Sequence, residues 1–221
     1  MFHFSELVQT ILLIVGALFP IVNPLGNTPI FLTLTRGFSS ATRKVLARKI
    51  ALNGFVLLAV SLLIGTHILA FFGISLPVVQ VGGGMVVIAT GWTLLNRRDD
   101  EDHTHGPHHS PNPSDVSRRA FYPLTLPLTV GPGSISVAIT VGANRPQNIG
   151  ASLPSLEAAV AGAALIGISI YLSYRFAESI ARWLGDTGMN IVIRLSSFIL
   201  LCIGVQIAWN GVSALLRTVI H

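Results

Sequence analysis

The sequence predicts an all-α membrane protein with six transmembrane helices, arranged as two inverted three-helix repeats with broken first helices. Three observations lead to this prediction. The 221 residues are 51% hydrophobic and only 10% charged, whereas about a quarter of the residues of a soluble domain are charged. A spanning helix needs ~20 mostly apolar residues, so the length suits six spans. Two apolar segments, one in each half, are interrupted by proline and glycine.

The first apolar segment covers residues 6–35 and is interrupted by the run Phe-Pro-Ile-Val-Asn-Pro-Leu-Gly-Asn-Thr-Pro at residues 19–29. An unbroken helix of that length would measure ~45 Å, which exceeds the ~30 Å of a bilayer's hydrocarbon core. Proline removes a backbone donor and disfavours helix at the preceding residue. We therefore expect the helix to break at Asn23-Pro24-Leu25-Gly26.

The second half repeats this device in the segment 120–141, where Gly-Pro-Gly-Ser occupies residues 131–134. Backbone groups freed at membrane depth are tolerated only where protein covers them or where they line a polar cavity. Paired Gly/Pro-interrupted segments in the two halves of a chain are typical of transporter binding sites. The pair therefore favours a substrate site over a simple packing kink.

The remaining spans are expected at residues 50–72, 76–95, 156–176 and 190–216. Arg43, Lys44, Arg48 and Lys49 are expected in a basic loop, and residues 175–186 in an amphipathic connection. The glycines at 82–84 and the small residues at 158–167 predict close helix packing, because small side chains let membrane helices approach. Cys202 is the single cysteine, so an intramolecular disulfide is excluded.

The chain divides into a first three-span repeat (residues 1–96), a His/Asp-rich cytoplasmic linker (97–119) and a second three-span repeat (120–221). The net charge of +5 does not indicate nucleic-acid binding, because the cations flank apolar runs. Eleven of the fourteen lysines and arginines lie in the connections 1–2, 3–4 and 5–6. The positive-inside rule makes these connections cytoplasmic and both termini periplasmic. Each half has three spans, and because three is odd, the second half enters the membrane from the opposite side. The two halves are therefore expected to be inverted relative to one another.

Nine residues at the two breaks are the candidate substrate-binding residues: Asn23, Pro24, Gly26, Asn27 and Thr28 in one half-site, and Gly131, Pro132, Gly133 and Ser134 in the other. A helix N-terminus attracts anions such as a carboxylate, and carbonyl and amide oxygens accept from an ammonium group. The sites therefore suit a small zwitterionic amino acid. We expect no enzyme activity, no catalytic or metal-binding residue and no cofactor; the coupling ion, a proton or sodium, is left open.

These two motifs, residues 19–29 and Leu-Pro-Leu-Thr-Val-Gly-Pro-Gly-Ser-Ile at 126–135, resemble those of the MarC family, also called the neutral amino acid transporter family. The resemblance extends over nearly the whole chain in span number and motif order. It implies a protein of the bacterial inner membrane that transports small neutral amino acids such as alanine, glycine or serine. The chain departs from the expected pattern in its His-rich linker and in Gln80, where an arginine is expected.

Two other functions remain open. One is an exporter of another small metabolite or drug on the same fold. The other is a metal-handling protein that uses His103, His105, His108 and His109 of the linker, although such histidine runs impose no fixed geometry. The expected partners are the amino acid and the lipid bilayer, without nucleic acid, and a homo-oligomer is also left open.

Overall fold

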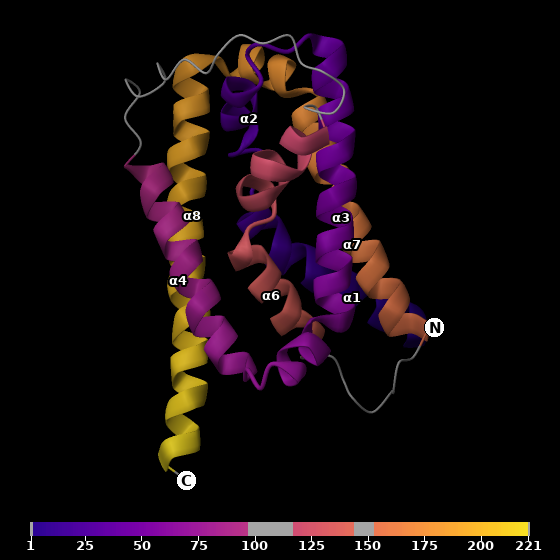
Figure 1. The fold of residues 1–221 in the computed structure, drawn as a ribbon, viewed down its shortest axis with the longest axis vertical. Helices are drawn as coiled ribbons and strands as arrows, with labels where there is room; N and C mark the ends of the chain where they lie inside the picture. Colours follow the sequence, from indigo (N-terminus) through magenta and orange to yellow (C-terminus); the bar gives the residue numbers. More distant parts are fainter. Residues whose placement is uncertain (1, 97–116, 144–152, 221) are drawn as a thin grey trace.

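The computed structural model describes residues 2–96, 117–143 and 153–220, and these parts of the chain are almost entirely helical (Figure 1). The elements are α1 (Phe2–Val22), α2 (Thr28–Leu34), α3 (Ser40–Phe71), α4 (Leu76–Leu95), η2 (Ala120–Thr129), α6 (Pro132–Ala143), α7 (Leu153–Arg175) and α8 (Ala177–Ile220). Among the described residues, five helices are long and apolar enough to cross a membrane, and six spans result when the bent pair 117–129 and 132–143 counts as one. The prediction of an all-α membrane protein is confirmed.

Both predicted breaks are present. Helix α1 ends at Val22, directly before Asn23-Pro24, and the short helix α2 begins at Thr28 with Pro29 in its first turn. Proline fits there because the first helical N–H groups have no intrahelical acceptor. In the second half, η2 and α6 meet at a bend of 67°. Both interruptions therefore end one helix and begin another inside an apolar segment, and the second also changes the direction of the chain.

The prediction of a basic loop before the second span was wrong. Arg43, Lys44, Arg48 and Lys49 lie in the first turns of α3, which begins at Ser40. The Ser39 Oγ accepts a hydrogen bond from the Thr42 N–H at 3.2 Å and caps the helix. A helix can continue beyond the hydrocarbon core into the polar interface, so apolar length alone does not locate its start.

The amphipathic connection after the fifth span is also helical. It forms the beginning of α8, which starts at Ala177, and a break at Gly185 separates it from the span. Gly185 has φ +64° and ψ 179°, a combination that only glycine adopts readily. The chain therefore changes direction once more at this position, between the surface part of α8 and its membrane part.

The helices form two groups with the broken segments between them (Figure 1). Helix α3 packs against α7, and α7 against α1, while α4 crosses α8 as a separate pair. Helix α6 contacts both α3 and α4, and α2 contacts both α7 and α8. The two breaks are thus enclosed by helices from both halves of the chain.

Glycines bring α4 and α8 into backbone contact, as the small residues at 82–84 predict. A Cβ atom added to Gly84 would lie 2.5 Å from the Ala208 nitrogen, and one on Gly204 would lie 2.7 Å from the Ile88 nitrogen. On α7, a Cβ on Gly162 would lie 2.6 Å from the Ile14 Cγ2 of α1. Side chains larger than hydrogen would separate these helices, and lipid supplies no hydrophobic force to hold them together.

Candidate functional site

The first break is a tight turn built around Asn23. Its backbone is left-handed, with φ 45°, a conformation that asparagine tolerates better than most residues. The Asn23 Oδ1 accepts from the Gly26 N–H at 3.1 Å, and the Asn23 carbonyl accepts from the Asn27 N–H at 3.0 Å. A Cβ at position 26 would overlap the Asn23 side-chain amide. Asn23 and Gly26 are therefore needed together to form this turn.

Asn27 joins the first break to the second. Its side chain is buried, with 5% exposed. The Nδ2 group donates to the Val22 carbonyl at 3.0 Å and to the Leu128 carbonyl at 3.1 Å. The first carbonyl ends α1, and the second belongs to η2, 101 positions along the chain. One amide group thus satisfies a carbonyl from each broken segment, which brings the two interruptions together in space.

The second break lies between η2 and α6. The backbone leaves helical geometry at Tyr122 and Leu126, each of which precedes a proline. The Val130 N–H still reaches back to the Thr125 carbonyl at 2.9 Å, and the Gly131 carbonyl begins α6 by accepting from the Ile135 N–H at 3.1 Å. Pro123 and Pro127 account for these departures inside η2, because proline disfavours helix at the residue before it, and Pro132 takes the first position of α6.

The serine after the second break supports the local turn. The Ser134 Oγ donates to the Gly131 carbonyl at 2.9 Å. Thr28 makes the corresponding contact at the first break, where its Oγ1 donates to the Pro24 carbonyl at 3.0 Å. Both hydroxyl hydrogens are therefore used locally, and the lone pairs of both oxygens remain as acceptors.

Helix α4 covers the start of α6. The Ser136 Oγ donates to the Val79 carbonyl of α4 at 2.8 Å. A Cβ on Gly83 would overlap the Ser136 side chain, and one on Gly133 would overlap Val87. Of the glycines at 82–84, Gly83 therefore packs against the broken segment, Gly84 packs against α8, and Gly82 has no neighbour within 4 Å.

A buried aromatic pair, which the sequence reasoning missed, connects both breaks to α7. Tyr174 stacks on Phe31 of α2 with ring centroids 4.5 Å apart and planes 2° from parallel. Its hydroxyl also lies 2.8 Å from the Thr129 Oγ1 of η2. A tyrosine at the end of an apolar run is typical of the membrane interface, so no signal in the sequence indicates this buried position. Only the fold places it beside both interrupted segments.

The structure places the nine candidate residues as follows. Asn23, Pro24, Gly26, Asn27 and Thr28 are buried in one turn, and Gly133 and Ser134 are buried at the start of α6. Gly131 is half-buried, whereas Pro132 is exposed. The direct link between the two half-sites runs through Asn27 and Leu128 rather than between candidate residues. None of the nine side chains is ionisable, so the site offers only neutral donors and acceptors.

The described residues contain no group of three or more His, Cys, Asp or Glu side chains that could hold a metal ion. The histidines of the linker lie outside the described residues.

Comparison with known proteins places this chain in a family. The family model described as "MarC family integral membrane protein" matches residues 8–216. The chain is 32% identical to membrane protein YvbG of Bacillus subtilis, over 90% of this chain and 92% of that protein. It is 28% identical to inner membrane protein MarC of Escherichia coli, over 91% and 93%. No solved structure matches the chain. This multi-pass protein therefore belongs to the MarC family of integral membrane proteins.

Proposed function

We propose that this protein is a secondary transporter of small neutral amino acids in the bacterial inner membrane, and that it has no enzymatic activity. The observation that carries the proposal is the meeting of two broken membrane segments at the Asn27 side chain. Broken helices at mid-membrane supply backbone groups to bind polar substrates, and they occur where protein covers them or where they line a cavity. Membership of the MarC family agrees with a membrane transport role.

The chemistry of the breaks favours a zwitterion. The start of α6 offers unpaired N–H groups and a partial positive charge to a carboxylate. Carbonyls at the unwound turns and the hydroxyl oxygens of Thr28 and Ser134 can accept from an ammonium group. The surrounding residues, such as Val22, Val130 and Leu128, are apolar. We therefore expect a small uncharged substrate side chain, of the alanine, glycine or serine class.

The pattern of helix packing supports two inverted repeats. Helix α3 packs on its proposed counterpart α7, and α4 packs on its counterpart α8. Other contacts also occur as counterpart pairs. Helix α1 contacts α7, and its proposed counterpart η2 contacts α3. Helix α2 contacts α8, and its proposed counterpart α6 contacts α4. A pseudo-twofold axis would relate these pairs. We accordingly retain residues 1–96 and 120–221 as the two repeats, joined by the 97–119 linker.

The decisive experiment is transport by the purified protein in liposomes. Radiolabelled alanine should accumulate under a proton or a sodium gradient, and excess glycine or serine should inhibit the uptake. The gradient that drives accumulation would name the coupling ion. Liposomes that hold an Asn27→Leu variant should show no uptake, because the amide that joins the two breaks is lost. Liposomes that hold an Asn96→Leu variant are the control, since Asn96 is exposed at the end of α4.

Absence of alanine flux under every gradient would overturn the substrate assignment. In that case export of another small metabolite or drug on the same fold becomes the better explanation. Altered drug sensitivity of a deletion strain, with unchanged amino acid flux, would support that alternative.

A further inference from the structure

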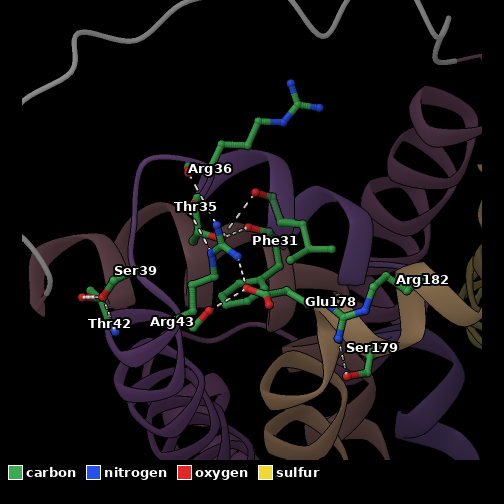
Figure 2. Close-up of polar contacts among 11 residues, drawn as sticks. Phe31, Thr35, Arg36, Ser39, Thr42, Arg43, Glu178, Ser179 and Arg182 are labelled. Atoms are coloured by element: carbon green, nitrogen blue, oxygen red, sulfur yellow. Dashed lines mark hydrogen bonds and ion pairs between the residues drawn. The ribbon is translucent and has the colours of Figure 1, made fainter.

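At one end of the molecule, Arg43 connects three helices from both halves of the chain (Figure 2). Its Nη1 forms an ion pair with the Glu178 Oε1 at the start of α8. Its Nε donates to the Thr35 carbonyl at 3.1 Å, and its Nη2 to the Arg36 carbonyl at 3.5 Å. The Ser40 Oγ of α3 donates to the same Glu178 oxygen at 3.1 Å.

These contacts stabilise two helix ends, the C-terminal end of α2 and the N-terminal end of α8. Helix α2 has only seven residues, too few to be stable alone, and Arg43 binds the carbonyls of Thr35 and Arg36, directly after its C-terminal end. The Arg43 guanidinium supplies donors and a positive charge at this C-terminal end, where a cation is favourable. Glu178 lies in the first turn of α8, where an anion is favourable for the same reason. Arg43 of α3 therefore joins the end of α2, through its hydrogen bonds, to the beginning of α8, through the ion pair.

Two more contacts join the first half to residues 117–119, which lead into η2. The Lys49 Nζ of α3 donates to the Ser117 Oγ, just before η2. The Arg119 guanidinium lies 5.4 Å from the centroid of the Phe38 ring. All of these cations belong to the connections that the positive-inside rule assigns to the cytoplasm. The cytoplasmic end of the boundary between the halves is thus held by polar contacts.

We propose that Arg43 and Glu178 are positioning residues of a cytoplasmic gate, and that their ion pair holds α2 against α8 in a state closed to the cytoplasm. This inference rests on the proposed transport function and deepens it. Transport by alternating access requires the halves to separate at one face and close at the other. Since the pair bridges the halves, opening toward the cytoplasm must break it.

The exposure of the pair suits this role. The Arg43 and Glu178 side chains are 19% and 38% exposed, so water competes for both charges and the net stabilisation is small. Such a contact can form and break in every cycle. Gly185, seven residues after Glu178, provides a break in α8, so that the segment which carries Glu178 can move relative to the span.

The test measures whether a buried reporter becomes accessible when the pair is broken. In a Cys202→Ser background, a Thr35→Cys reporter is introduced; Thr35 is fully buried under the pair, and the substitution keeps the carbonyl that Arg43 binds. A membrane-impermeant maleimide is applied to inside-out and to right-side-out vesicles. Adding Glu178→Gln should raise the labelling rate severalfold in inside-out vesicles and leave it unchanged in right-side-out vesicles.

Two controls separate a gate from a general loosening of the fold. Arg182→Gln removes a charge from the same segment of α8, but Arg182 is exposed and its Nη2 donates to the neighbouring Ser179 Oγ at 3.3 Å; it should leave the labelling rate unchanged. A Ser61→Cys reporter, buried in the middle of α3, should stay unreactive in every variant.

Equal Thr35→Cys labelling in the Glu178→Gln and Arg182→Gln variants would overturn the gate. Faster labelling of both reporters together would also overturn it, because it would show a structural role alone. Labelling needs no substrate, so it is independent of the alanine assay. Failure of alanine uptake by the wild-type protein would therefore refute the proposed substrate without changing the result for the gate.

Discussion

At the scale of single residues, the site depends on a few side chains whose hydrogen bonds reach between segments. Asn27 is the clearest case, because both hydrogens of its amide are donated to carbonyls that end or interrupt a helix. Tyr174 is the second, because its ring and its hydroxyl contact different broken segments. These two residues connect the two broken segments to each other.

An Asn27→Asp substitution tests the first of these. It replaces a buried double donor by a carboxylate that faces two carbonyl oxygens, so it should destabilise the protein by about 3 kcal/mol and abolish transport. Thermal unfolding in detergent would measure the stability. Asn96→Asp is the matched control, because the Asn96 Nδ2 makes one exposed bond, to the Trp92 carbonyl at 3.1 Å. Equal unfolding temperatures for the two variants would contradict the bridging role.

A Tyr174→Phe substitution tests the second. It keeps the stack on Phe31 and removes the hydroxyl bonded to Thr129. Loss of one buried hydrogen bond should cost about 1 kcal/mol. Tyr171→Phe, three residues earlier on α7, removes a hydroxyl that accepts from Arg175 at an exposed position and should cost less. A larger shift of the unfolding temperature for Tyr171→Phe would speak against the buried bond.

At the scale of helices, close packing through glycine decides how the elements assemble. Helix α4 contacts α8 where Gly84 and Gly204 allow the backbones to approach, and it contacts α6 through Gly83. Apolar area contributes little to this assembly, because each helix exchanges contact with lipid for contact with protein. The shape of the contacting faces must therefore supply the specificity.

Gly84→Val and Gly82→Val provide a matched pair on α4. A side chain at position 84 would collide with the α8 backbone, 2.5 Å from the Ala208 nitrogen, whereas position 82 has nothing within 4 Å. Overpacking costs about 1–3 kcal/mol, so Gly84→Val should lower the unfolding temperature and Gly82→Val should change it little. If both variants unfold at the wild-type temperature, α4 and α8 do not pack closely at Gly84.

At the scale of the whole molecule, α2 and the starts of α3 and α8 lie toward one end of the helix assembly, and the C-terminus lies toward the other (Figure 1). Arg43, Lys44, Arg48 and Lys49 belong to the start of α3, and Arg43 links this end of α3 to the end of α2 and to the start of α8. The positive-inside rule assigns this end to the cytoplasm. We therefore propose that both termini are periplasmic.

Reporter fusions test this orientation. Alkaline phosphatase fused after Arg217 should be active, and a fluorescent protein fused there should be dark, because the end of α8 would lie outside the cytoplasm. The same reporters fused after Asn96, at the end of α4, should show the reverse behaviour. Fluorescence from the Arg217 fusion would invert the proposed topology.

Much of this organisation was predictable from the sequence. The apolar runs predicted the spans, and proline and glycine predicted both breaks, because these effects depend on local backbone chemistry and on the thickness of a bilayer. Start points were less predictable. The basic residues of α3 look like a loop by hydropathy, yet they continue the helix from the Ser39 cap.

The sequence by itself therefore determined the membrane class, the family resemblance and the places where the helices break. Only the tertiary structure decided which groups meet at those breaks. The bond from Asn27 to Leu128, the stack of Phe31 on Tyr174 and the ion pair between Arg43 and Glu178 all join residues far apart in the chain. Local propensity carries no information about such pairings, because they follow from how the two halves pack across one another.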